Sequence, residues 1–255
     1  MIDAVAAAAD RGGFATLWAG EHVVMVDRSA SRYPYSDDGV IAVPAQSDWL
    51  DPMIALAFAA AASSRIGLAT GALLLPEHNP VVVAKQAASL DRLSGGRLTL
   101  GVGIGWSREE FAALGVPFER RAARTAEYVA AMRTVWHDDV ASFEGEFVAS
   151  DSIRVNPKPL RYRNIPMVVG GNSESMNWCS SIRRPTAPTP PPTGLRHWPA
   201  AGWRRAPHNC SAIRWPSCAA AIPNTTLTTM LAIAGRSWRS SPRRWVSSIQ
   251  VENVV

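Results

Sequence analysis

The first two thirds of the chain alternate between short apolar runs and segments in which apolar residues recur at helical spacing. Nearly unbroken apolar runs cover residues 14–20, 66–72, 97–103 and 165–169, and each ends at, or directly before, a glycine or another small residue. Parallel strands have this pattern because helices cover both faces of their sheet. The pattern therefore predicts four buried parallel strands.

Five segments before and between these runs are predicted to be helices. Ser107, with Glu110 three residues later, has the spacing of a capping box in which Ser107 is the N-cap. Asp48 or Asp51 is the candidate cap of an earlier helix, and Pro52 fits its first turn. The predicted helices cover residues 2–10, 51–62, 81–93, a short stretch after 107, and 121–136.

Strands that alternate with helices are typical of α/β proteins, and the pattern leaves a doubly wound sheet and a (β/α)8 barrel open. Residues 141–148 and 152–155 are predicted to form a small hairpin outside this repeat, and residues 27–47 a long polar loop. Such folds place their chemistry at the carboxyl ends of the strands. The residues directly after each predicted strand are therefore the candidates for function.

Composition divides the chain near residue 175. Residues 176–255 contain 10 Arg, no Lys and one acid, for a net charge of +9, whereas residues 1–175 carry −4. The same segment holds six of the ten tryptophans and ten of the nineteen prolines. A GC-rich gene that is read out of frame tends to encode this amino-acid composition. We therefore hypothesise one domain over residues 1–175, followed by a divergent tail, residues 176–255, that is disordered or frameshifted.

Several classes of protein are disfavoured. No apolar run reaches 18 residues, which argues against a membrane span, and the first residues lack the basic stretch of a secretory signal, so a cytoplasmic location is expected. Cys179, Cys210 and Cys218 lack metal-binding spacing, so no metal site is expected. Arginine and tryptophan in the tail would suit nucleic acid, but its scattered prolines favour disorder, so nucleic-acid binding is not expected.

Four segments then carry a resemblance to a known family: WAGEHV, LATGALLLPEHNPVVVAKQAASLDRLSGGRLTLGVGIGW, FxALGVPFxxR and VGGNS. Together they resemble the luciferase-like monooxygenases, particularly the oxidoreductases that use the deazaflavin coenzyme F420. The resemblance covers about residues 2–175. It implies a partial (β/α)8 TIM-type barrel that lacks the first strand and, beyond Glu174, the C-terminal strands.

The resemblance also implies roles for residues at two strand ends. Glu21 and His22 would face the cofactor ring, where an imidazole can polarise substrate or assist proton transfer. The alternative is a structural histidine at the barrel rim. Gly71 and Ala72 occupy the place where family members commonly have a non-prolyl cis peptide bulge that supports the deazaflavin. The alternative there is a glycine kept for strand packing.

Three glycines from Gly101 to Gly105 have GxGxG spacing, which differs from the GxGxxG of dinucleotide-binding folds. Gly103 is instead expected to let a flat ring approach the backbone, with Trp106 as a wall, although tight strand packing also explains these glycines. Asn79 before Pro80 is expected to cap a helix, and the alternative role is a contact with the cofactor.

A last candidate follows the strand at 165–169. Backbone N–H groups of Gly170, Gly171 and Asn172 would form an anion nest for a cofactor phosphate. The alternative is an ordinary turn from strand to helix.

These residues lead to one preferred function and two alternatives. The preferred function is hydride transfer between coenzyme F420 and an organic small-molecule substrate. The alternatives are an FMN-dependent monooxygenase, and a non-catalytic fragment or basic-tailed binding protein. Family members often dimerise, and no membrane partner is expected.

Overall fold

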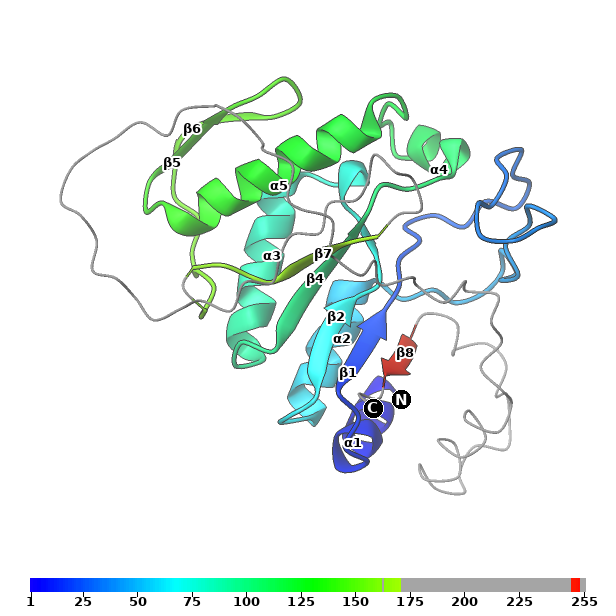
Figure 1. Cartoon of the computed structure of the whole chain (residues 1–255), viewed down its shortest axis with the longest axis horizontal. Coiled ribbons are helices and arrows are strands. Elements are labelled where there is room, and N and C mark those ends of the chain that lie inside the picture. Colours follow the sequence, from blue (N-terminus) through cyan, green and yellow to red (C-terminus); the bar gives the residue numbers. More distant parts are fainter. Residues whose placement is uncertain (162, 171–248, 253–255) are drawn as a thin grey trace, which may run out of the picture.

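The computed structural model describes residues 1–161, 163–170 and 249–252. Four parallel strands form its centre, in the spatial order β1, β2, β4 and β7 (Figure 1). A fifth short strand, β3, pairs with the carboxyl end of β4 on the side of β2. The strands are β1 (Thr16–Ala19), β2 (Gly67–Thr70), β3 (Leu73–Leu74), β4 (Leu98–Gly103) and β7 (Met167–Val169). The four predicted strands are therefore confirmed.

The predicted helices are also confirmed, with ends that agree to within two residues. They are α1 (Ile2–Arg11), α2 (Pro52–Ala62), α3 (Pro80–Leu93), α4 (Arg108–Ala113) and α5 (Arg121–His137), with a 3-10 turn, η1 (Leu75–Glu77), before α3. Two expected caps are present. The Asp51 carboxylate accepts the Ile54 N–H at 2.8 Å, and the Ser107 hydroxyl accepts the Glu110 N–H at 3.2 Å.

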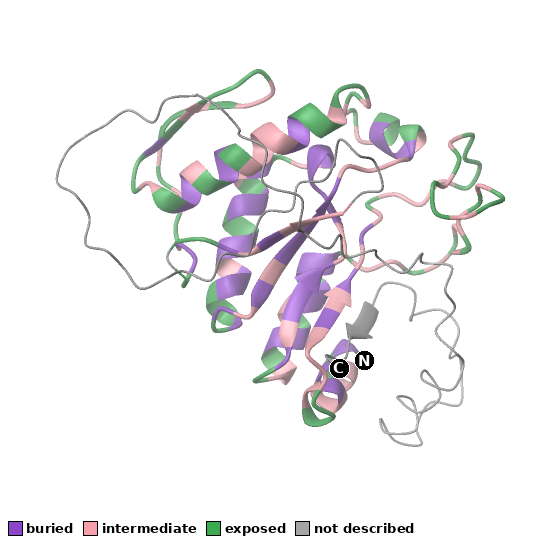
Figure 2. Ribbon diagram, in the orientation of Figure 1, coloured by how far each residue is buried: buried purple, intermediate pink, exposed green. Residues whose placement is uncertain are grey.

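The helices form a row in which α1 packs on α2, α2 on α3, and α3 on α5. Helices α2 and α3 lie on the same face of the sheet (Figure 1). Most residues of β2 and β4 are buried (Figure 2). Fully buried strand residues, Leu17, Leu68 and Leu100 among them, belong to the same hydrophobic core as residues of these helices. Strands in sequential order under a single layer of helices are those of a β/α barrel, since a doubly wound sheet carries helices on both faces. The structure is therefore a partial barrel.

Two further strand pairs lie outside the parallel sequence. The predicted hairpin is confirmed as β5 (Ala141–Glu144) and β6 (Ala149–Ile153), which pair antiparallel. Strand β8 (Ile249–Glu252) pairs antiparallel with β1, a contact that the sequence did not predict. The rest of the segment 176–255, which was expected to be divergent, lies outside the described residues.

The long polar segment is a loop as predicted, with no helix or strand between Gly20 and Asp51. It leaves the carboxyl end of β1 and returns to the start of α2. In the described part of the chain, no helix is both long and apolar enough to cross a membrane.

Candidate functional site

His22 lies directly after β1, between two tryptophans and a buried carboxyl group. Its Nδ1 is 3.1 Å from Oε2 of Glu110, which is 1% exposed. The His22 ring meets Trp49 edge-on at 5.3 Å and Trp106 at 6.2 Å between ring centroids. Since a carboxylate can only accept a hydrogen bond, from Nδ1–H, this contact selects the neutral tautomer that leaves Nε2 without a proton. Among the described residues, no hydrogen-bond partner reaches Nε2.

Glu21, the preceding residue, turns to the opposite side. Its Oε2 accepts the Leu74 N–H at 2.6 Å, and both carboxylate oxygens are 3.1 Å from Nε2 of His78. Burial by itself lowers the pKa of His78, but the hydrogen bond and the charge of Glu21 raise it above its ordinary value. Glu21 therefore ties the end of β1 to β3 and to the residue after η1.

Glu77 adds a third buried carboxyl group at this edge of the sheet. It is 7% exposed, and neither of its oxygens has a hydrogen-bond partner among the described residues. Burial, and then the negative charges of Glu110 and Glu21, raise the pKa of Glu77 to about 9. Glu77 is therefore protonated at neutral pH. Within the described ranges, no group of three potential ligands is placed to hold a metal ion.

The strand that starts at β2 is interrupted at Gly71 and Ala72, which precede β3. The peptide bond between these residues is cis, as the resemblance led us to expect. A Cβ atom on Gly71 would lie 3.0 Å from the ring of Trp18. Both residues are half-buried, so small side chains line the carboxyl edge of the sheet at this point.

The glycines of β4 serve the contact with the neighbouring strands. A Cβ atom on Gly101 would lie 2.0 Å from the Thr70 carbonyl oxygen, which excludes any larger residue. At Gly103 the nearest atoms, in Ala72 and Leu74, would be 3.3 Å away. The packing explanation therefore holds for Gly101. At Gly103 a Cβ atom would be a tight contact that small shifts of Ala72 or Leu74 could relieve.

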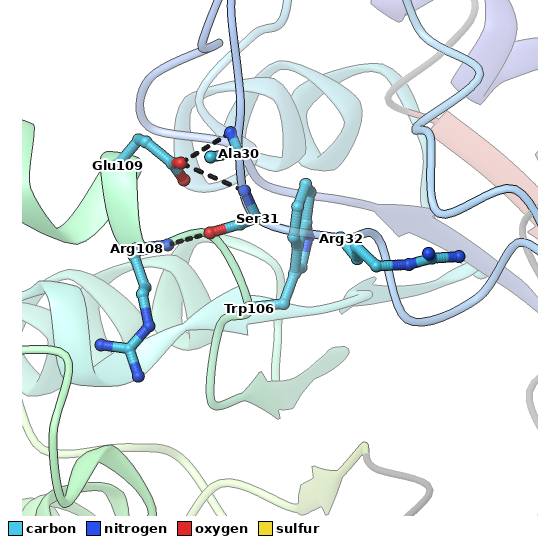
Figure 3. A pocket seen from close by; sticks show the side chains of 6 residues that line it. All are labelled: Ala30, Ser31, Arg32, Trp106, Arg108 and Glu109. Carbon is cyan, nitrogen blue, oxygen red and sulfur yellow. Dashed lines mark hydrogen bonds between the residues drawn. The ribbon is translucent and has the colours of Figure 1, made fainter.

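Trp106 contacts His22 and also faces the long loop, where it lines a cavity. Its ring also meets Tyr33 of the long loop at 5.2 Å. On this side lies a cavity of about 330 Å³, drawn in Figure 3. Its lining comes from the loop and from the start of α4: Ala30, Ser31, Arg32, Trp106, Arg108 and Glu109.

The remaining candidate residues cap a helix, take part in sheet pairing, or lie outside the described residues. Asn79 is exposed and caps α3, since its side-chain oxygen accepts the N–H groups of Val81 and Val82 at 3.0 and 3.2 Å. The Gly170 N–H donates to Val102 within the sheet, so it is already used. Gly171 and Asn172 lie outside the described residues.

Sequence reasoning missed four members of this group. They are Trp49 of the loop, Glu77 of η1, His78 directly after it and Glu110 of α4. Glu77 and His78 lay within a segment quoted for the resemblance but received no role, and Glu110 was noted only as part of the capping pattern. That pattern misplaced its side chain. In a capping box Glu110 would accept the Ser107 N–H, but its oxygens contact His22 and the Val24 N–H instead.

Sequential parallel strands under one helix layer, with ionisable side chains at their carboxyl ends, define a protein of the β/α barrel class. Within that class, residues 2–177 match the family model of the luciferase-like monooxygenases, and the chain belongs to this family.

Three known proteins illustrate the similarity. The uncharacterized protein Rv0953c of Mycobacterium tuberculosis is 37% identical over 177 residues, which are 69% of this chain and 62% of that protein. An FMNH(2)-dependent dimethylsulfone monooxygenase of Pseudomonas putida is 34% identical over 107 residues, 41% of this chain and 30% of that protein. The structure of the coenzyme F420-dependent tetrahydromethanopterin reductase of Methanopyrus kandleri superposes with a TM-score of 0.52 and 22% identity, over 69% of this chain and 47% of that one. The chain thus spans about three fifths or less of the length of each.

Proposed function

We propose that the chain is part of an oxidoreductase that transfers a hydride between coenzyme F420 and a small organic substrate. The observation that carries this proposal is one oriented imidazole, His22, beside a strand edge of small residues. Gly71, Ala72 and Gly103 lie at that edge, and Trp106 stands next to the imidazole. This arrangement suits a flat ring laid against the backbone.

When bound, the deazaflavin supplies the hydride chemistry, and the chain supplies position and a proton path. Nε2 of His22 would accept or donate the proton that accompanies hydride transfer, because Glu110 occupies Nδ1. Glu21 would act indirectly, since its carboxylate holds β3 and His78. The phosphate site proposed at Gly170, Gly171 and Asn172 would depend on the last two, because the Gly170 N–H is used in the sheet.

An FMN-dependent monooxygenase is the second candidate function. It is favoured by the FMNH(2)-dependent relative, which is more similar in sequence than the F420-dependent structure. The same strand edge would hold either ring. A small-molecule substrate and a second copy of the chain are the partners that the resemblance implies, and both remain predictions.

Titration of the purified protein with F420 and, separately, with FMN tests the proposal through quenching of fluorescence. Tighter binding of F420 supports the proposed function, and preference for FMN supports the second candidate. Ala72→Leu should weaken binding because it places a larger side chain at the half-buried strand edge. The matched control is Ala112→Leu, at an exposed position of α4. Binding of neither ring would favour a non-catalytic fragment or a basic-tailed binding protein.

A further inference from the structure

The first turn of α4 presents two adjacent carboxylates to the long loop that follows β1. Glu110 points inward. Its Oε2 contacts Nδ1 of His22 at 3.1 Å, and its Oε1 accepts the Val24 N–H at 3.2 Å. Both oxygens are thus used by the first residues of a loop that lies more than 80 positions earlier in the chain.

Glu109 holds the middle of the same loop. Its Oε1 accepts the backbone N–H groups of Ala30 at 2.8 Å and Ser31 at 3.1 Å, and its Oε2 accepts the Ser29 hydroxyl at 3.3 Å. In return, the Ser31 hydroxyl oxygen accepts the Arg108 N–H at 3.1 Å (Figure 3). Hydrogen bonds from Ser31 and Ala30 lower the pKa of Glu109 to about 2, so this carboxylate is charged at neutral pH.

We propose that Glu110 is the positioning residue of His22, and that Glu109 and Glu110 together form a clasp that holds the loop over the carboxyl edge of the sheet. The loop has no helix or strand of its own between Gly20 and Asp51, and carboxylates of α4 accept hydrogen bonds from Val24 and from residues 29–31. The clasp has two functions. Glu110 sets the tautomer of His22, and Glu109 keeps the loop against Trp106. The first function rests on the role proposed for His22.

Glu110→Gln gives a sharp test of the positioning role. A glutamine has one acceptor oxygen, whereas Glu110 accepts from two donors, Val24 N–H and His22 Nδ1–H. With the amide oxygen on Val24, the amide NH2 group faces Nδ1, and the favourable arrangement moves the imidazole proton to Nε2. The ¹⁵N chemical shifts of the His22 ring report this tautomer directly in the neutral form.

We expect the Nδ1–H tautomer in the unchanged protein, its inversion to Nε2–H in Glu110→Gln, and its recovery in Glu110→Asp, which keeps the carboxylate. Glu119→Gln is the matched control, because Glu119 is an exposed glutamate paired with Arg108. An unchanged Nδ1–H tautomer in Glu110→Gln would overturn the positioning role. Far-UV circular dichroism verifies that each variant is folded.

The holding function is tested by limited trypsin digestion, because the loop carries two exposed trypsin sites, Arg28 and Arg32, on either side of the segment bound by Glu109. Glu109→Gln removes a charged acceptor of three hydrogen bonds from the loop, so cleavage at these sites should accelerate about tenfold. Glu119→Gln should leave the rate unchanged. Equal rates in both variants would refute the clasp. Neither readout needs a cofactor, so failure of the titration above and failure of the clasp are distinguishable.

Discussion

Glu77→Gln should remove a pH-dependent loss of stability that this carboxyl group imposes on the fold. The pKa of Glu77 is raised from 4.5 to about 9 because the group is buried and faces the charges of Glu110 and Glu21. Between these two pH values the folded chain retains a proton that the unfolded chain has released. Stability is therefore fully present below pH 4.5 and falls as the pH rises toward 9.

The magnitude follows from that interval. Each pH unit within it costs about 1.4 kcal/mol, so at pH 7 the loss attributed to Glu77 is at most about 3.5 kcal/mol, and water that enters the site reduces it. Glutamine cannot ionise. Its amide also remains without a partner, which adds a penalty that does not vary with pH. The slope with pH, rather than stability at a single pH, therefore measures the effect.

Urea unfolding followed by tryptophan fluorescence at several pH values between 5.5 and 8.5 provides the assay. The free energy of unfolding of Glu77→Gln minus that of the unchanged protein should increase steadily across this range. The same difference for Glu119→Gln should stay flat, because the pKa of exposed Glu119 is lowered by its hydrogen bond with Arg108. A flat difference for Glu77→Gln as well would show that the carboxyl group is ionised throughout, and would refute the reasoning.

Three further outcomes are expected. The pKa of His78 is raised in the folded protein, so the stability that its protonated ring contributes is complete below pH 6.5 and is lost as the pH rises through the pKa of the folded state. The difference in unfolding free energy between the unchanged protein and His78→Gln should therefore shrink above pH 6.5 in urea titrations. Asn79→Ala should cost about 1 kcal/mol in the same assay, because the cap of α3 is lost. Gly101→Ala should abolish the folded circular dichroism spectrum, since its Cβ would lie 2.0 Å from the Thr70 carbonyl oxygen, whereas Gly103→Ala, with 3.3 Å of separation, should fold.

The fold was predictable because its signals are local. Unbroken apolar runs mark β1, β2, β4 and β7, and Asp51 and Ser107 mark the starts of two helices. Strand β3 and strand β8 were not foreseen. Strand β3 follows the Gly71–Ala72 interruption, which the apolar pattern crosses without a break, and β8 pairs with β1, which lies far from it in the sequence.

The site was predictable only as a location. Sequence indicated that the carboxyl ends of the strands carry the functional residues, and Glu21 and His22 do lie there. It did not indicate that Glu77 and Glu110 would join them. Glu110 reaches His22 across 88 positions of the chain, and Glu77 is affected by the charges of Glu110 and Glu21, which lie 33 and 56 positions away. The capping pattern even predicted a different hydrogen-bond partner for Glu110, the Ser107 N–H. Long-range contacts of this kind have no counterpart in spacing or periodicity.

Glu21 and His22, which follow β1 and Gly20, connect the end of this strand to two different parts of the structure. Glu21 and His22 are adjacent, and adjacent side chains in an extended segment point to opposite sides. One therefore reaches β3 and His78, and the other reaches α4 through Glu110. The imidazole that we propose as the proton carrier is thus oriented by a helix far along the chain, and its own strand only brings it near. It follows that substitutions in α4 should alter the tautomer of His22 even where they leave β1, Gly71, Ala72 and Gly103 unchanged.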